Sequence, residues 1–134
     1  MNDYDRRIIE EFRANGGRVG GHWKGRDLLL LTTTGRRSGK RHTTPMAYTR
    51  DGERLLTYAS NSGADEHPGW YLNVIATPEV VVEVGDERFD ATATPLQGEE
   101  REREYAAQSA RVPAFAEYQE NTTRLIPVVA LRRR

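Results

Sequence analysis

Basic side chains are concentrated in one short glycine-bounded segment of the sequence, Gly35–Arg41. They are Arg36, Arg37, Lys40 and Arg41. No Asp or Glu occurs between Asp27 and Asp51, so nothing in the local sequence neutralises these cations. A turn of this composition can present backbone N–H groups to an anion, and arginine adds bidentate contacts to phosphate or carboxylate. The segment is consistent with an anion-binding turn or with an ordinary solvated hairpin tip.

The same segment does not meet the requirements of a nucleotide-binding P-loop. Gly35 and Gly39 are one residue closer than that motif requires, and Arg41 stands where a Ser or Thr would hold magnesium. The residues after the turn are typical of a strand, whereas a P-loop leads into a helix. The sequence therefore excludes this class of phosphate site.

The remaining polar residues form no recognisable catalytic or metal-binding motif. His22, His42 and His67 lack the spacing of a zinc-binding pair, and the absence of cysteine excludes thiolate catalysis and disulfides. No serine occupies a G-x-S-x-G elbow, and adjacent acids such as Glu99 and Glu100 are typical of a solvated surface. We expect no metal and no catalytic side chain. This leaves either a binding protein or an enzyme whose cofactor supplies the chemistry.

Length and charge bound the kind of protein that carries this segment. With 134 residues, we predict a single domain over residues 1–134, in which residues 1–21 form an N-terminal helix and a connecting loop. Twenty Lys and Arg residues balance twenty Asp and Glu residues, which argues against a nucleic-acid partner. Apolar runs such as Leu28–Leu31 are too short to span a membrane. The charged first 13 residues do not resemble a signal peptide, so we predict a cytoplasmic protein.

Apolar periodicity, the placement of charges and the positions of proline together predict four helices. Their expected ranges are 3–15, 68–77, 97–111 and 113–120. In the first, Tyr4, Ile8 and Phe12 recur on one stripe, and Asn2 or Asp3 can cap its start.

Six β-rich segments predict strands. Their expected ranges are 28–34, 42–48, 55–60, 80–84, 87–94 and 125–131. Pro127 lies inside the last range, which indicates an edge strand or a bulge. Because most connections are short and no βαβα alternation occurs, we predict an α+β fold, mainly β. Its expected core is a small barrel of about six mostly antiparallel strands with flanking helices.

Longer motifs resemble, in the same order along the chain, those of the deazaflavin-dependent nitroreductase family. They are Leu29–Gly39, Thr44–Met46, Ala59–Ala64, Pro68–Asn73, Pro78–Val84, Tyr118–Gln119 and Ile126–Val129. The resemblance covers nearly the whole chain from Ile8 onward. It implies a split β-barrel similar to flavin-reductase-like barrels, and coenzyme F420 as the bound hydride carrier. That cofactor has a phosphate and an acidic oligoglutamate tail, which would give the basic segment a purpose.

The resemblance also implies a set of cofactor-binding residues. They are Arg36, Arg37, Ser38, Arg41, His42, Thr43, Thr44, Pro45, Met46, Tyr58, Ala59, Ser60, Asn61, Trp70, Tyr71 and Asn73. Arg36 and Arg37 would pair with phosphate or tail carboxylates. Trp70 would form an aromatic wall, although core packing is an equal alternative for this side chain. His42 stands where relatives often carry Arg, which would weaken binding of the tail.

By the same resemblance, the acceptor would be a quinone or a nitroaromatic compound. Ala47, Phe115 and Tyr118 are the expected substrate contacts. Ala47 and Phe115 stand at positions that are tyrosines in a relative that reduces nitro drugs, so we do not expect activation of bicyclic nitroimidazoles.

Several alternatives remain open at this point. The chain could be a split-barrel protein that binds FMN or haem, or a non-catalytic F420 carrier. Its N-terminal helix could contact a membrane surface or pack on the barrel. The sequence is compatible with a monomer or a homodimer.

Overall fold

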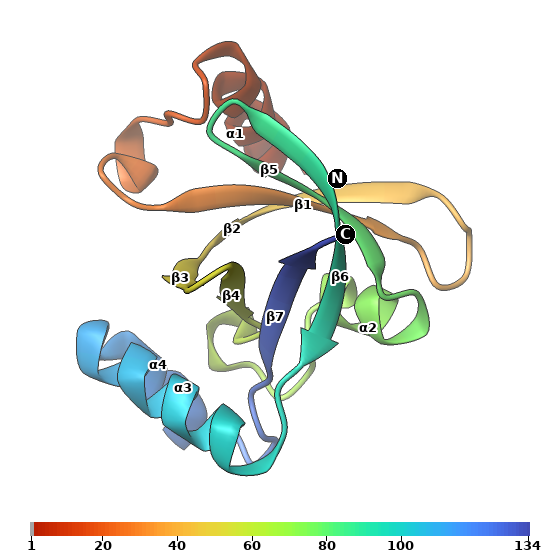
Figure 1. The fold of residues 1–134 in the computed structure, drawn as a ribbon. Helices are drawn as coiled ribbons and strands as arrows, with labels where there is room; N and C mark the ends of the chain where they lie inside the picture. The colour runs from red at the N-terminus through yellow and green to blue at the C-terminus, as the bar shows by residue number, and fades with distance from the viewer. Residues whose placement is uncertain (1) are drawn as a thin grey trace.

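The computed structural model describes residues 2–134, whose seven strands form one sheet (Figure 1). The strands are β1 (Leu28–Thr34), β2 (Arg41–Ala47), β3 (Thr49–Asp51), β4 (Arg54–Tyr58), β5 (Glu79–Val84), β6 (Glu87–Pro95) and β7 (Val128–Arg133). Their order in the sheet is β2-β1-β5-β6-β7-β4-β3, and neighbouring strands are antiparallel.

The sheet curls into a half-barrel, and its two edge strands are neighbours in sequence. Tyr48 alone separates β2 from β3. Thr57 Oγ1 in β4 donates a 3.0 Å hydrogen bond to the carbonyl oxygen of Ala47 at the end of β2. The barrel core holds side chains such as Leu31 and Val129, both fully buried. The predicted mainly β, antiparallel split barrel is confirmed.

Four helices and two short 3-10 turns surround the sheet. They are α1 (Asp3–Ala14), η1 (Gly21–Trp23), η2 (Asn61–Gly63), α2 (Gly69–Ala76), α3 (Gly98–Arg111) and α4 (Ala114–Glu120). The predicted cap of α1 is confirmed, because Asn2 Oδ1 accepts a 2.7 Å hydrogen bond from the backbone N–H of Asp5. No helix within residues 2–134 is long and apolar enough to cross a membrane.

Helix α1 packs on the outer face of β1. The buried cluster between them contains Ile8, Ile9, Phe12, Leu28 and Leu30. Leu29 and Leu31 alternate with these strand residues and face the barrel core, so β1 is buried on both faces. Arg13 adds a bidentate ion pair with Glu83 of β5, at 3.0 and 2.8 Å, and this hydrogen bonding raises the pKa of Arg13. The turn that follows β1 therefore extends from a rigid strand.

Two expectations for the strands are corrected. No strand was expected at β3, a three-residue edge strand that pairs with β4. The last strand begins at Val128 rather than at Leu125, which is 59% exposed. It pairs with both β4 and β6, so the expectation of an edge strand is wrong. Pro127 is tolerated because it precedes the ladder, where its carbonyl oxygen accepts from the N–H of Ala59 at 3.0 Å.

Candidate active site

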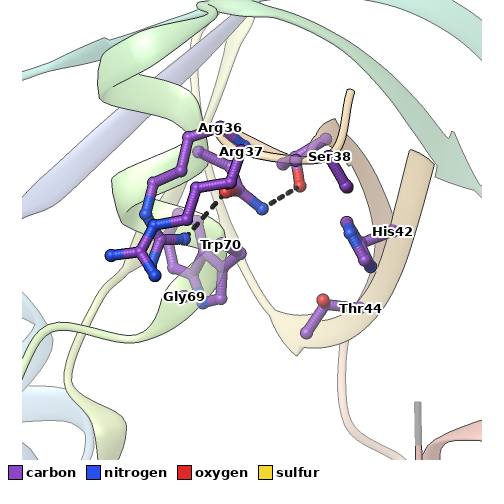
Figure 2. Close-up of a pocket in the computed structure, with 10 residues that line it drawn as sticks. Arg36, Arg37, Ser38, His42, Thr44, Gly69 and Trp70 are labelled. Carbon is purple, nitrogen blue, oxygen red and sulfur yellow. Dashed lines mark hydrogen bonds between the residues drawn. The ribbon is translucent and has the colours of Figure 1, made fainter. Parts of the chain in front are cut away.

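A pocket of about 470 Å³ opens between the β1–β2 turn and the start of α2 (Figure 2). It is lined by Thr33, Gly35, Arg36, Arg37, Ser38, His42, Thr44, Gly69, Trp70 and Asn73. Seven of these ten residues belong to the cofactor-binding set expected from the sequence. None of the ten is acidic and two are arginines, so the pocket attracts anions. Figure 2 shows Arg36 and Arg37 on one side, with His42 and Thr44 on the strand across from them.

Strand alternation decides which side chains of β2 reach the pocket. His42 lies opposite Thr33 in the β1–β2 ladder, and Thr44 follows two residues later on the same face. Because successive side chains of a strand point to opposite faces, these three residues share the inner face of the sheet. All three line the pocket.

The other expected residues of β2 lie outside the pocket lining. Thr43 points to the opposite face, where its Oγ1 atom lies 2.8 Å from Thr32 Oγ1. Pro45 shares that face. Met46 is buried in the barrel core, and Arg41 is exposed at the start of the strand.

Backbone hydrogen bonds hold the turn between β1 and β2. The N–H of Gly35 donates to the carbonyl oxygen of Lys40 at 2.7 Å, and the N–H of Gly39 donates to that of Gly35 at 2.9 Å. A Cβ at position 35 would lie 2.7 Å from Ser38 Oγ and 2.9 Å from His42 Nε2, so any other residue there would displace these two side chains. Ser38 and His42 therefore pack directly on the backbone of the turn.

Asn73 joins the turn to α2 and β1. Its side chain is buried, and its Oδ1 atom accepts from the backbone N–H of Arg36 at 3.1 Å and from Arg36 Nη1 at 3.0 Å. Its Nδ2 atom donates to Thr33 Oγ1 at 3.2 Å. These contacts fix the direction of Arg36 at the pocket.

The other cations of the turn are free to meet a ligand. The side chains of Arg37, Lys40 and Arg41 are exposed and make no hydrogen bond or ion pair within residues 2–134. Guanidinium groups in this state can bind phosphate or carboxylate oxygens in bidentate fashion.

Helix α2 supplies the aromatic wall. Trp70 is half-buried and lines the pocket, and its ring meets that of Tyr71 edge-on at a centroid distance of 6.3 Å. Tyr71 points away from the pocket lining toward His67, with ring centroids 4.8 Å apart. Burial raises the pKa of Tyr71, so its phenol stays neutral.

Four expected cofactor residues lie where β4 ends and its following loop begins. Tyr58 and Ala59 are buried, Ser60 is half-buried and Asn61 is exposed. None of the four lines the pocket.

Arg124 contributes to the structure of the site, and the sequence motifs did not indicate this role. Its guanidinium donates to the carbonyl oxygens of Ala59, Ser60 and Ala64 at 3.2, 2.8 and 2.8 Å, and contacts His67 Nδ1 at 3.0 Å. It thus organises the loop that leads into α2. A lone arginine in an irregular segment carries no sequence signal for such a role.

Two of the three expected acceptor contacts lie together in an aromatic cluster outside the pocket lining. The ring centroids of Phe115 and Tyr118 lie 5.4 Å apart. The ring centroid of Phe115 lies 5.5 Å from that of Tyr58 and 6.3 Å from that of Tyr105. Neither Phe115 nor Tyr118 lines the pocket, and Ala47 is exposed at the end of β2. No group of three or more metal-ligating side chains occurs in the described residues 2–134.

Comparison with known families identifies this arrangement. The family of F420H(2)-dependent quinone reductases matches residues 4–133. The chain belongs to this family. The family resemblance seen in the sequence motifs is therefore confirmed, and with it an oxidoreductase class that depends on coenzyme F420.

Individual relatives agree with the family. An F420H(2)-dependent quinone reductase of Mycobacterium tuberculosis is 39% identical over 129 residues, which cover 92% of this chain and 85% of that protein. A solved F420-H2 dependent reductase is 41% identical, with a TM-score of 0.72 over 84% of this chain and 100% of that one. A second solved relative, described as a domain-swapped dimer, is 39% identical, with a TM-score of 0.74 over 95% and 96% of the two chains.

More distant structures share the fold alone. A heme storage protein of Vibrio cholerae is 17% identical and has a TM-score of 0.62 over 94% of this chain and 87% of that one. This likeness places the half-barrel among the split barrels.

The pocket fits coenzyme F420. An anionic phosphate and tail suit an acid-free pocket with two arginines, and Arg36 is already directed by Asn73. A flat ring suits the aromatic surface of Trp70.

Proposed function

We propose that this chain is an oxidoreductase that binds coenzyme F420 between the β1–β2 turn and α2 and reduces quinones. The supporting observation is the acid-free pocket that combines Arg36, Arg37 and Trp70 in a member of this family. The chemistry that reduced F420 supplies when bound is hydride transfer to an electron-poor acceptor. The chain's own contribution is to hold the coenzyme in place and to limit access of water.

The cations of the turn bind the charged part of the coenzyme. Arg36 and Arg37 form charge-assisted hydrogen bonds to phosphate or tail carboxylates. Ser38 and His42 donate further hydrogen bonds from the pocket rim. Arg41 extends the positive field along β2.

The residues of α2 and β2 that line the pocket would hold the ring of the coenzyme. Trp70 gives it an apolar wall, and Thr44 offers a hydroxyl group from β2. The remaining expected residues support the pocket from behind or from the loop after β4: Thr43, Pro45, Met46, Tyr58, Ala59, Ser60, Asn61 and Tyr71.

Acceptors are quinones first and nitroaromatic compounds second. Ala47, Phe115 and Tyr118 are the proposed acceptor contacts.

The proposal also includes the domain organisation, the location and the oligomeric form of the protein. It is a single cytoplasmic domain over residues 1–134, with no nucleic-acid partner. A homodimer is favoured over a monomer by the relative described as a dimer. Peripheral membrane contact through α1 is tested by flotation with lipid vesicles.

A fluorescence titration with F420, run beside one with FMN, tests the cofactor. We expect micromolar or tighter binding of F420 and little binding of FMN. Oxidation of reduced F420 is then followed by absorbance with quinones and with nitroaromatics. Preference for FMN would overturn the role of the turn, and tight F420 binding without acceptor-dependent oxidation would indicate a carrier.

A further inference from the structure

All three nitrogen atoms of the Arg124 guanidinium hold the loop between β4 and α2. Nε donates to Ala64 at 2.8 Å, Nη2 to Ser60 at 2.8 Å, and Nη1 to Ala59 at 3.2 Å and to His67 Nδ1 at 3.0 Å. Arg124 comes from the segment that precedes β7, far away in sequence. A lysine ammonium could not reach this spread of acceptors, because the donors of guanidinium form a fixed, planar fork.

The loop held in this way has an unfavourable backbone conformation. Asn61, Ser62 and Gly63 have φ angles of 46°, 54° and 81°. Two of these residues are not glycine, and side chains disfavour the left-handed region. Such a conformation persists only where surrounding contacts fix it. Arg124 supplies contacts on both sides of the strained residues.

The same loop continues directly into the pocket wall. His67 is followed by Pro68 and then by α2, which carries Trp70 and Asn73 into the pocket lining. On its other side the loop is packed against α4, since a Cβ at Gly63 would lie 3.0 Å from Tyr118 Cα. A change in the loop therefore moves the start of α2.

The contact between Arg124 and His67 depends on proton position. A guanidinium can only donate, so His67 Nδ1 accepts and the neutral ring carries its proton on Nε2. A second proton on Nδ1 would remove this hydrogen bond and place like charges together. The ring of Tyr71 of α2 packs against that of His67, and Asp65 and Glu66 precede His67 in its own loop. Burial, and then the charge of Arg124, lower the pKa of His67.

We infer that Arg124 is a positioning residue for the pocket, and that it releases the β4–α2 loop when His67 takes up a proton. The effect on F420 rests on the proposed function, whereas the release of the loop does not. At neutral pH the loop is held and α2 is fixed. At acidic pH the loop loosens and F420 binds more weakly.

Hydrogen exchange of the amides of Gly63 and Ala64 tests the release. These amides donate within the loop, to Ser60 at 2.8 Å and Asn61 at 3.1 Å. We expect their protection factors to fall at least tenfold from pH 7.5 to pH 5.5. Arg124→Lys should lower protection at both pH values, whereas His67→Asn, which keeps an acceptor that does not titrate, should abolish the pH dependence. Arg103→Lys, on the exposed face of α3, is the matched control.

F420 titrations on the same proteins test the positioning role. At pH 7.5 we expect Arg124→Lys to raise the Kd for F420 several-fold. A change from pH 7.5 to pH 5.5 should raise the Kd several-fold in the unchanged protein but not in His67→Asn. Unchanged protection in Arg124→Lys, or pH-independent protection in the unchanged protein, would overturn the release. Lost protection with unchanged Kd would overturn the positioning role. If the unchanged protein binds no F420, the proposed function fails while the exchange data still decide the release. Should Arg124→Lys not fold, His67→Asn decides alone.

Discussion

The side-chain oxygen of Asn73 accepts hydrogen bonds from both the backbone and the guanidinium of Arg36. One buried amide thus sets the position of the turn and the direction of its first cation. Because Arg36 is ordered before a ligand arrives, less side-chain entropy is lost on binding. The affinity of the pocket for anions therefore depends on a residue of α2.

Replacement of Asn73 tests this dependence. Asn73→Ala leaves the N–H of Arg36 and the hydroxyl of Thr33 without this partner, so we expect a loss of about 1–3 kcal/mol in the free energy of unfolding. F420 affinity should fall as well. Asn73→Asp keeps an acceptor for Arg36 and should retain more of both. Urea denaturation and F420 titration give the two quantities, and equal stability of the Ala variant would contradict the role.

Removal of the turn's arginines tests the anion site. The double variant Arg36→Ala/Arg37→Ala should bind F420 at least several-fold more weakly, because charge-assisted bidentate contacts are lost. The matched control is Arg6→Ala/Arg7→Ala, which removes the same charge from an exposed face of α1. The difference between the two should shrink as salt rises. Normal binding by the turn variant would exclude recognition of the tail by these arginines.

The N-terminal helix provides a stability test. Phe12 is 1% exposed and packs on Leu30, so Phe12→Ala should lower the free energy of unfolding by about 3–5 kcal/mol. Tyr4→Ala, at a residue that is 48% exposed, should change it by less than about 0.5 kcal/mol. Thermal and chemical denaturation measure both. An unaffected Phe12 variant would mean that α1 does not pack on the barrel in solution.

Gly17 and Gly52 form a matched pair for a backbone test. Both have positive φ, of 92° and 62°, but a Cβ on Gly17 would lie 2.6 Å from Gly85 Cα, whereas one on Gly52 would meet nothing within 4 Å. Gly52→Ala should cost about 1–2 kcal/mol from the left-handed conformation alone. Gly17→Ala should cost clearly more, because backbone must move. Comparable losses in denaturation experiments would refute the close approach of the two loops.

His67 predicts how stability depends on pH. Its pKa is lowered in the folded protein, first by burial and then by Arg124, so the unfolded chain binds more protons below the ordinary value of about 6.5. Stability should therefore fall as the pH drops below about 6.5, until the folded-state pKa is passed. Carboxylates add their own dependence, so the useful quantity is the difference between the unchanged protein and His67→Asn. An absence of any difference from pH 7.5 to pH 5 would contradict the contact with Arg124.

The fold could be predicted wherever a segment carried its own periodicity. Leu28–Thr34 shows the β-branched and apolar residues of a buried strand, and it is β1 at those bounds. The strand Thr49–Asp51 could not be predicted, since three polar residues become a strand only when the curled sheet brings β4 beside them. The apolar neighbours of Pro127 suggest that it belongs to a strand. In the structure the strand begins one residue later, at Val128.

The candidate site likewise contains some residues that the local sequence indicates and others that it does not. Local composition singles out Arg36 and Arg37 as candidates for an anion-binding turn, and both line the pocket. Arg124 was not recognisable, since its role depends on carbonyl groups of Ala59 and Ser60, which lie 65 and 64 residues earlier in the chain. Phe115 packs beside Tyr58 and Tyr105, and the sequence alone does not distinguish such a packed position from one that also covers an acceptor.

Among the seven strands of the sheet, β7 comes last in sequence, yet it lies between β6 and β4. In the described part of the chain, the ladder partners of β4 are β3 and β7, with Leu55 opposite Leu131. The β3–β4 hairpin can therefore join the sheet only through β7. Pairing across so long a loop is intrinsically slow. Completion of the half-barrel thus requires that β7 has left the ribosome, and a nascent chain without β7 exposes two unpaired strand edges to its surroundings.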